Sequence, residues 1–208
     1  MPQPLTGPTF LQSAQVEHAA RLLGKAFQDD PLMAYISPSE ARRRRRLPAF
    51  FRVAVRYCLR YGTVYTTEGL EGVACCLPPG QTEPSVSRLL RIVLSGSLWL
   101  PGPLELRRAL HATTYTDETH ASTAPGAHWY LWVLGVEPEK QGRGTGGRLL
   151  QTVLQQAREQ GVPCYLETEN PRNVPFYQKH GFRLVREVAI PKSDVRIYAL
   201  LWEAGEDS

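Results

Sequence analysis

Long apolar runs and strong net charge are what this 208-residue chain has little of. No stretch approaches the ~20 apolar residues that a membrane-spanning helix needs. The N-terminal segment Met1–Pro8 has neither a basic start nor an apolar stretch, so it does not resemble an export signal. The formal net charge of +4 suits an acidic ligand but is too small to indicate nucleic-acid binding by itself. We therefore expect a soluble, cytoplasmic protein without a membrane or nucleic-acid partner.

Cysteine is also scarce, and its spacing excludes two classes of site. The four cysteines are Cys58, Cys75, Cys76 and Cys164. They form no C-x-x-C pair and two are adjacent, which is not the pattern of a disulfide framework. Cys75 or Cys76 could act as a nucleophile in principle, but neither has a candidate base nearby in the sequence. We interpret both as packing residues with reduced thiols.

Histidines and arginines give two further candidate sites. His111, His120 and His128 lack the H-x-x-x-H spacing of a helical metal site, so we expect surface or partly packed histidines and no metal. Five arginines, Arg42 to Arg46, form a basic run that could contact nucleic acid or a membrane surface. Five consecutive helical positions spread around the axis, however, so the run favours a solvated helix start over a binding site.

Hydrophobic periodicity and turn residues predict one α/β domain over residues 1–208. Expected helices cover residues 12–28, a segment that begins at the arginine run and ends before Gly62, and two segments between 85 and 124 that break at 99–103. Expected strands end at 10–11 and cover 63–67, 73–77, 129–136, 164–168, 183–189 and 195–202. Asp29-Asp30-Pro31 should end the first helix, because the residue before a proline avoids helical geometry. These elements predict a mixed, mostly antiparallel sheet flanked by helices, with a helical insertion before the central strand.

The central block, residues 128–182, carries the clearest chemistry. The buried strand Trp129–Val136 leads to a glycine-rich turn, Gln141-Gly142-Arg143-Gly144-Thr145-Gly146-Gly147, and then directly to a helix. Glycines allow a turn whose N–H groups point at one spot, and the positive end of the helix dipole adds to them. Arg143 and Arg148 contribute formal positive charge. The turn therefore predicts a site for a phosphate or pyrophosphate.

Two cofactor classes use such a turn. Gly142, Gly144 and Gly147 satisfy the dinucleotide pattern G-x-G-x-x-G, and Glu167 lies twenty residues beyond Gly147. In that fold, however, the first glycine sits almost at the end of the strand, whereas residues 137–141 intervene here. Only 61 residues follow Gly147, which are too few for the further units of a doubly wound sheet.

The turn fits better with a second pattern, Gln/Arg-x-x-Gly-x-Gly/Ala, which Gln141 to Gly146 match without a gap. The preceding Val133-Leu134-Gly135-Val136-Glu137-Pro138 and the later Asn173-Val174-Pro175-Phe176-Tyr177-Gln178-Lys179-His180-Gly181-Phe182 match two further motifs in the same order. Together the three motifs resemble the Gcn5-related N-acetyltransferase (GNAT) family. Within it, Leu166-Glu167-Thr168 with Pro171-Arg172-Asn173 and Pro175-Phe176-Tyr177 looks most like the puromycin N-acetyltransferase branch.

This resemblance implies transfer of an acetyl group from acetyl-coenzyme A to a primary amine of a small molecule, by direct attack within a ternary complex. The implied coenzyme-binding residues are Leu134, Val136, Gln141, Gly142, Arg143, Gly144, Thr145, Gly146, Gly147 and Asn173. A backbone N–H at Val136 would stabilise the oxyanion, Leu134 would bind the pantetheine arm, and the loop amides would bind the pyrophosphate. No metal is implied, and a homodimer is possible because dimers are common in the family.

Two side chains are the catalytic candidates under this resemblance. Tyr177 would protonate the departing thiolate, although its position beside Phe176 and Phe182 also fits a core tyrosine. Glu167 lies at the carboxyl end of its predicted strand, where functional groups of an open sheet gather. It would accept the proton of the amine directly or through water, or else only bind the ammonium or pair with Arg172.

The acceptor side is less defined by the sequence. Asp29 and Asp30 fit a helix cap and turn, or the rim of an acceptor pocket where carboxylates attract a cationic amine. The resemblance implies that Phe27, Asp29 and Asp30 contribute to that pocket. Two alternative functions remain, a non-catalytic acyl-coenzyme A sensor and a protein N-acetyltransferase.

Overall fold

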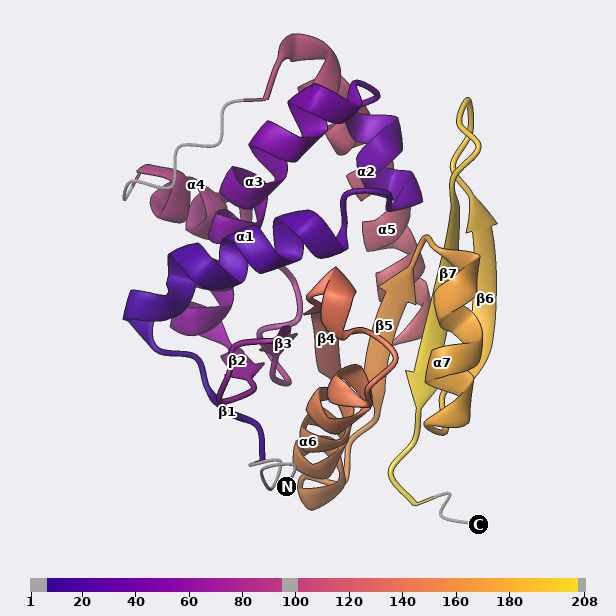
Figure 1. Cartoon of the computed structure of the whole chain (residues 1–208). Helices are drawn as coiled ribbons and strands as arrows, with labels where there is room; N and C mark the ends of the chain where they lie inside the picture. Colours follow the sequence, from indigo (N-terminus) through magenta and orange to yellow (C-terminus); the bar gives the residue numbers. More distant parts are fainter. Residues whose placement is uncertain (1–6, 95–100, 206–208) are drawn as a thin grey trace.

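A single mixed sheet organises the chain in the computed structural model, which describes residues 7–94 and 101–205. Its seven strands lie in the order β1-β2-β3-β4-β5-β7-β6 (Figure 1). The strands are β1 (Thr9–Phe10), β2 (Thr63–Thr66), β3 (Gly72–Leu77), β4 (Trp129–Val136), β5 (Cys164–Thr168), β6 (Arg183–Ala189) and β7 (Arg196–Trp202). Only β4 and β5 pair in parallel, and every other neighbouring pair is antiparallel. The predicted mostly antiparallel α/β domain is confirmed, and the doubly wound alternative is wrong because it requires a parallel sheet.

Helices cover both faces of this sheet. They are α1 (Val16–Ala26), α2 (Pro31–Ile36), α3 (Glu40–Tyr61), α4 (Val86–Leu94), α5 (Pro103–Thr123), α6 (Thr145–Glu159) and α7 (Val174–Lys179), with short 3-10 helices at Ser13–Gln15, Pro138–Lys140 and Pro171–Asn173. One hydrophobic cluster lies between the sheet and α1 with α3, and a second lies between the sheet and α6 with α7. Within the described residues, no helix is long and apolar enough to cross a membrane.

The adjacent cysteines of β3 point to opposite faces of the sheet and so belong to different hydrophobic clusters. Cys75 belongs to the cluster under α1 and α3, whereas Cys76 belongs to the cluster under α6, since successive strand residues point to opposite faces. Both thiols are fully buried, and burial raises the pKa of Cys76 well above its usual value. A buried thiol with a raised pKa is a poor nucleophile, so the packing interpretation of this pair fits the structure.

The pairing between β4 and β5 is short. Only Trp129 with Cys164 and Tyr130 with Tyr165 are in register, although β4 continues to Val136 and β5 to Thr168. On its other edge β4 pairs with β3, and the register shifts between Cys75 and Cys76, which leaves Trp132 as the extra residue of a bulge. A bulge increases the local twist, so β4 turns away from β5 beyond the two pairs.

Helix α1 packs very close to the end of β4. A Cβ atom built on Gly135 would lie 2.6 Å from Cδ2 of Leu23 and 3.2 Å from the ring of Phe27. Any side chain larger than hydrogen at this position would therefore push α1 away from the strand. The close approach brings the C-terminal end of α1 next to the unpaired part of β4.

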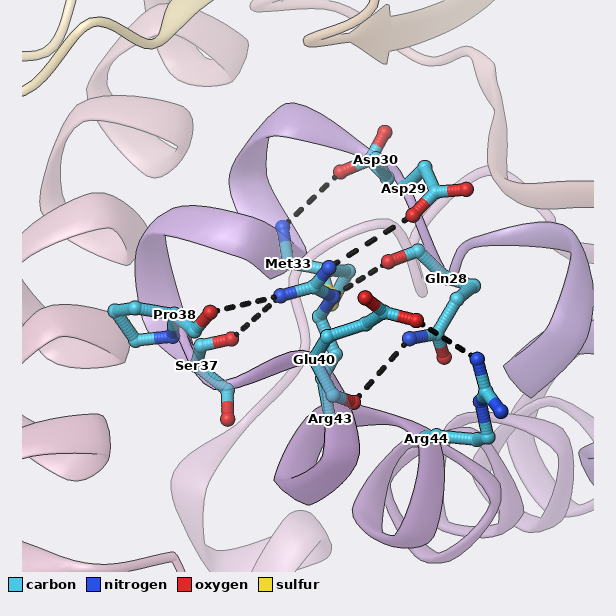
Figure 2. A network of polar contacts seen from close by, with 9 residues as sticks. All are labelled: Gln28, Asp29, Asp30, Met33, Ser37, Pro38, Glu40, Arg43 and Arg44. Atoms are coloured by element: carbon cyan, nitrogen blue, oxygen red, sulfur yellow. Dashed lines mark hydrogen bonds and ion pairs between the residues drawn. The ribbon is translucent and has the colours of Figure 1, made fainter.

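The arginine run does not behave as one solvated helix start, and this is a correction to the sequence interpretation. Arg43 is buried, and its guanidinium donates to the backbone oxygens of Gln28, Ser37 and Pro38 while lying 3.8 Å from the carboxylate of Asp29 (Figure 2). It therefore joins the turns on both sides of α2 to α3. The periodicity could not show this, because the acceptors are main-chain atoms of turns.

The other arginines of the run have different environments. Arg44 forms an exposed ion pair with Glu40 at 2.7 Å, one helical turn away (Figure 2). Arg46 pairs with Glu105 of α5, which also accepts from the Ser37 hydroxyl at 2.7 Å. Arg42 and Arg45 are exposed. Of the run, Arg43 and Arg46 thus connect α3 to the elements around α2.

Replacing Arg43 should destabilise the fold strongly. In Arg43→Met three backbone oxygens lose a charged donor, and we expect the free energy of unfolding to fall by about 2 to 4 kcal/mol. Arg45→Met, an exposed position in the same helix, is the matched control and should change it by less than about 0.5 kcal/mol. Urea denaturation followed by circular dichroism measures both. Equal effects of the two substitutions would contradict the structural role of Arg43.

Candidate active site

The glycine-rich turn has the backbone geometry that an anion site requires. Gly142 and Gly144 have φ angles of +74° and +81°, which L-residues rarely adopt, and α6 begins immediately afterwards at Thr145. The first N–H groups of a helix have no partner within it, so the amides of Thr145, Gly146 and Gly147 point out of the end of α6. Together they form a positive surface for a phosphate group.

Side chains attach this turn to the end of β4. The side-chain amide of Gln141 donates from Nε2 to the Val136 backbone oxygen at 3.1 Å. Two ion pairs hold the connecting segment, Lys25 with Glu137 at 2.5 Å and Lys140 with Glu71 at 2.9 Å. Gln141, expected to bind the coenzyme, therefore shapes the loop from within. These contacts link the strand end to the loop.

Charge and space at the start of α6 agree with an anion site. The Nε atom of Arg148 is buried without a hydrogen-bond partner in the described part of the chain, and its Nη2 lies 3.4 Å from the Thr145 hydroxyl. Arg143 is exposed on the loop. A Cβ atom on Gly147 would lie 2.8 Å from Nε2 of His180, so α7 packs directly against the first turn of α6. The glycines of the turn therefore have two roles. They allow the conformation that exposes the backbone N–H groups, and they leave room for this close contact.

Glu167 lies on the opposite face of the sheet from α6 and is held by two phenols. Its Oε2 accepts from the Tyr130 hydroxyl at 2.6 Å, and its Oε1 accepts from the Tyr165 hydroxyl at 3.0 Å. Burial raises the pKa of Glu167 to about 7, against the lowering effect of the two hydrogen bonds, and the charge of Asp117 raises it further. The partners of Glu167 are thus two phenols and not Arg172, whose pairing with Glu167 was one alternative from the sequence. A carboxyl group with this pKa can accept a proton near neutral pH.

More carboxylates surround Glu167. Burial, together with the charges of Asp30 and Glu167, raises the pKa of Glu169 well above its usual value. Asp30 is itself buried, which raises its pKa to about 6 even though the backbone N–H groups of Leu32 and Met33 donate to it. A cation bound beside these carboxyl groups would favour their charged forms, so the cluster suits a cationic ligand.

Residues 27–30 occupy different places. Asp30 caps α2 and accepts from the backbone N–H groups of Leu32 at 3.0 Å and Met33 at 3.2 Å, so the predicted cap is present. Figure 2 shows the contact with Met33. Asp29 is exposed and faces Arg43. Phe27 is half-buried, and its ring packs against Phe51 with centroids 4.9 Å apart. Of these three candidates for the acceptor pocket, only Asp30 is within electrostatic reach of the Glu167 region.

Tyr177 lies on the other face, in the core under α6 and α7. It is buried beside Phe176 and Phe182, with ring centroids 5.1 and 5.8 Å away. Burial raises its pKa, and the nearby Cys164 and Glu169 raise it further. Asn173 donates from its amide to the Thr168 hydroxyl at 3.1 Å and so ties the start of α7 to the end of β5. Leu134 also packs into this cluster.

The structure brings together residues that sequence reasoning did not assign to the site. Tyr165 and the predicted Glu167 occupy alternate positions of β5 and share a face, and Glu169 directly follows the end of the strand, so a period of two was a readable signal. Tyr130 joins them through the register of β4 and β5. His120 and His128 were expected at the surface or partly packed, but both are buried and their Nε2 atoms lie 2.7 Å apart. Among the described residues, no group of three or more His, Cys, Asp or Glu side chains has a metal-binding arrangement.

Comparison with known proteins gives a consistent result. The model of the acetyltransferase (GNAT) family matches residues 110–182. An uncharacterized N-acetyltransferase of Schizosaccharomyces pombe is 23% identical over 197 residues, which cover 90% of this chain and 78% of the relative. A mycothiol acetyltransferase of Corynebacterium aurimucosum is 34% identical over 90 residues, which cover 36% of this chain and only 30% of the relative.

Solved structures show the same fold along nearly the whole chain. A structure described as histone acetyltransferase HPA2 and related acetyltransferase from Corynebacterium glutamicum has a TM-score of 0.68 at 17% identity, covering 97% of each chain. An agmatine N-acetyltransferase has a TM-score of 0.61 at 18% identity, covering 94% of this chain and 98% of the other. The family match, which includes the glycine loop, supports an acetyltransferase enzyme, and the solved structures show a GNAT-like fold.

Proposed function

We propose that this protein transfers the acetyl group of acetyl-coenzyme A to a primary amine of a small cationic molecule by direct attack in a ternary complex. The observation that carries the proposal is the early end of β4–β5 pairing, with a phosphate-binding turn on one side and a carboxyl group of pKa about 7 on the other. The pyrophosphate would bind the amides of residues 145–147 and the cation of Arg148. The pantetheine arm would then follow β4 past Val136 and Leu134.

The two faces of the sheet supply different steps of the reaction. Glu167 accepts the proton that the ammonium must lose, and the free amine attacks the thioester carbonyl. A backbone N–H at the unpaired edge of β4, at Val136, stabilises the oxyanion. The C–S bond then breaks, and Tyr177 returns a proton to the thiolate. Because burial weakens Tyr177 as an acid, this last transfer needs the developing thiolate charge close to its hydroxyl.

Charge favours a cationic acceptor. The charges of Glu167 and Asp30 both act on Glu169, and an ammonium group entering beside these carboxyl groups would be attracted and then deprotonated. The agmatine N-acetyltransferase that shares this fold acts on an amine. A finer proposal, on the motifs at 166–168 and 171–177, is an acceptor like that of the puromycin N-acetyltransferase branch. Location in the cytoplasm and a homodimer remain predictions from the sequence and the family.

A panel of amines tests the function directly. We expect release of free coenzyme A thiol from acetyl-coenzyme A with at least one small primary amine, measured with a thiol reagent across polyamines, aminonucleosides, aminoglycosides and amino acids. A peptide with a free N-terminus and lysine serves as the arm for protein N-acetylation. Coenzyme binding without thiol release in any arm would favour the acyl-coenzyme A sensor instead.

Gly144→Ala should weaken coenzyme A binding because the new side chain disfavours the positive φ that directs the loop amides. We expect the dissociation constant to rise roughly tenfold, or about 1.4 kcal/mol, by titration calorimetry. Gly161→Ala is the matched control. It changes a glycine of φ +63° just beyond the other end of α6, also without a neighbour within 4 Å. Both variants should lose about 1 kcal/mol of stability, but equal loss of affinity would contradict the assignment of the loop.

Glu167→Gln should lower the turnover number roughly 10²-fold or more, since the variant has no proton acceptor. In the parent enzyme the rate should fall as the pH drops through about 7, because protonation removes the base. This acid limb of the pH–rate profile should disappear in the variant. Protonation of the free amine, with a pKa near ~10, is a separate effect that should remain. The exposed Glu187→Gln is the control and should keep the parent profile. An unchanged limb in Glu167→Gln would exclude Glu167 as the base.

Tyr177→Phe should preserve coenzyme affinity and lower turnover by roughly 10²-fold, because only the hydroxyl that protonates the thiolate is removed. Steady-state kinetics with calorimetry separates the two quantities. Tyr198→Phe, a half-buried tyrosine packed against the same cluster, should retain turnover. If Tyr177→Phe also retains it, Tyr177 is a core residue and another group accompanies the leaving thiol.

A further inference from the structure

The hydroxyls of Tyr130 and Tyr165 converge on a single carboxyl group. These two residues are the second and last aligned pair between β4 and β5, so they stand where the strands stop pairing. Each donates to a different oxygen of Glu167, at 2.6 and 3.0 Å. No motif of the sequence indicated either of them. The carboxyl group is thereby oriented from both strands at the point where they separate.

A rigid layer supports the two phenol rings. His120 of α5 stacks on Tyr165 with an interplanar angle of 9° and a centroid distance of 4.6 Å, and its ring lies 4.5 Å from that of Tyr130. His128 Nδ1 lies 2.7 Å from the Gly126 backbone oxygen, which can only accept. In its neutral form His128 therefore presents an unprotonated Nε2, and His120 donates to it across 2.7 Å. This fixed histidine pair leaves the Tyr165 ring little freedom to turn away from Glu167.

We propose that Tyr130 and Tyr165 are positioning residues that hold the Glu167 carboxylate in the orientation in which it accepts the proton of the acceptor amine. This inference rests on the proposed function. An ionised carboxylate has about four lone-pair positions, so two phenol donors leave one position free on each oxygen. Hydrogen bonds donated to the charged form stabilise it. The pair therefore keeps Glu167 competent as a base despite its burial.

Other charged groups nearby raise the pKa of Glu167 or act on the residues around it. Asp117 of α5 raises the pKa of Glu167, and Glu169 lies within range of the Glu167 charge. Asp30, at the start of α2, acts on Glu169, and Arg186 of β6 acts on Tyr165. Burial lowers the pKa of His120 to about 4, so it stays neutral at the pH of the reaction. The two phenols are thus the groups that oppose the effect of burial on Glu167.

The test measures the titration midpoint of Glu167 itself. The full chain is labelled with ¹³C at glutamate side-chain carboxyls, and the Glu167 resonance is identified by its loss in Glu167→Gln. In Tyr130→Phe and in Tyr165→Phe we expect the midpoint to rise by about one pH unit, and to rise further in the double variant. Tyr65→Phe, a buried sheet tyrosine in the cluster under α6, is the matched control and should leave it unchanged.

Kinetics then separates this inference from the proposed function. The acid limb of the turnover profile should move to higher pH with the midpoint, while the affinity for coenzyme A, measured by calorimetry, stays within twofold and shows that the variants are folded. If the titration midpoint of Glu167 stays unchanged or falls in both Tyr130→Phe and Tyr165→Phe, the positioning role is overturned. Midpoints that rise while the limb of the rate stays in place overturn Glu167 as the base, and with it the catalytic purpose of the pair.

Discussion

Only two residue pairs align between β4 and β5. The candidate active site depends on this early end of the pairing. The bulge at Trp132 increases the twist of β4, and the contact of α1 with Gly135 holds the strand end in place. Beyond Tyr130 and Tyr165 the two strands no longer pair with each other, so their facing backbone edges can bind an extended ligand. A fully paired parallel sheet would leave no such edge in the middle of a domain.

Electrostatics divides the site into a positive and a negative side. In the proposed function, the open amides at the start of α6 and Arg148 bind the phosphates of the coenzyme, whereas Glu167, Glu169 and Asp30 attract a cationic acceptor. Burial raises the pKa values of Asp30 and Glu167, and no ion pair of either group is seen among the described residues. On this proposal, an acceptor ammonium would favour the charged carboxylates on binding, which would couple acceptor binding to the formation of a charged base.

The elements were readable from the sequence because they follow local rules. The strands Trp129–Val136 and Cys164–Thr168 and the helix after the glycine loop end where apolar runs and glycines place them. Long-range partners were not readable. Arg43 binds main-chain oxygens that no side-chain pattern encodes, and His120 meets His128 only because α5 ends beside β4. Tyr165 and Glu167 show the intermediate case, since strand alternation groups them but only the fold adds Tyr130.

A crystal structure of the protein with coenzyme A tests the central claim most directly. We predict that the pyrophosphate contacts the amides of residues 145–147 and that the sulfur lies beside the unpaired end of β4, with Tyr177 and Glu167 on opposite sides of it. Coenzyme bound away from residues 141–147 would contradict this arrangement. So would strands β4 and β5 that pair along their whole length in the complex.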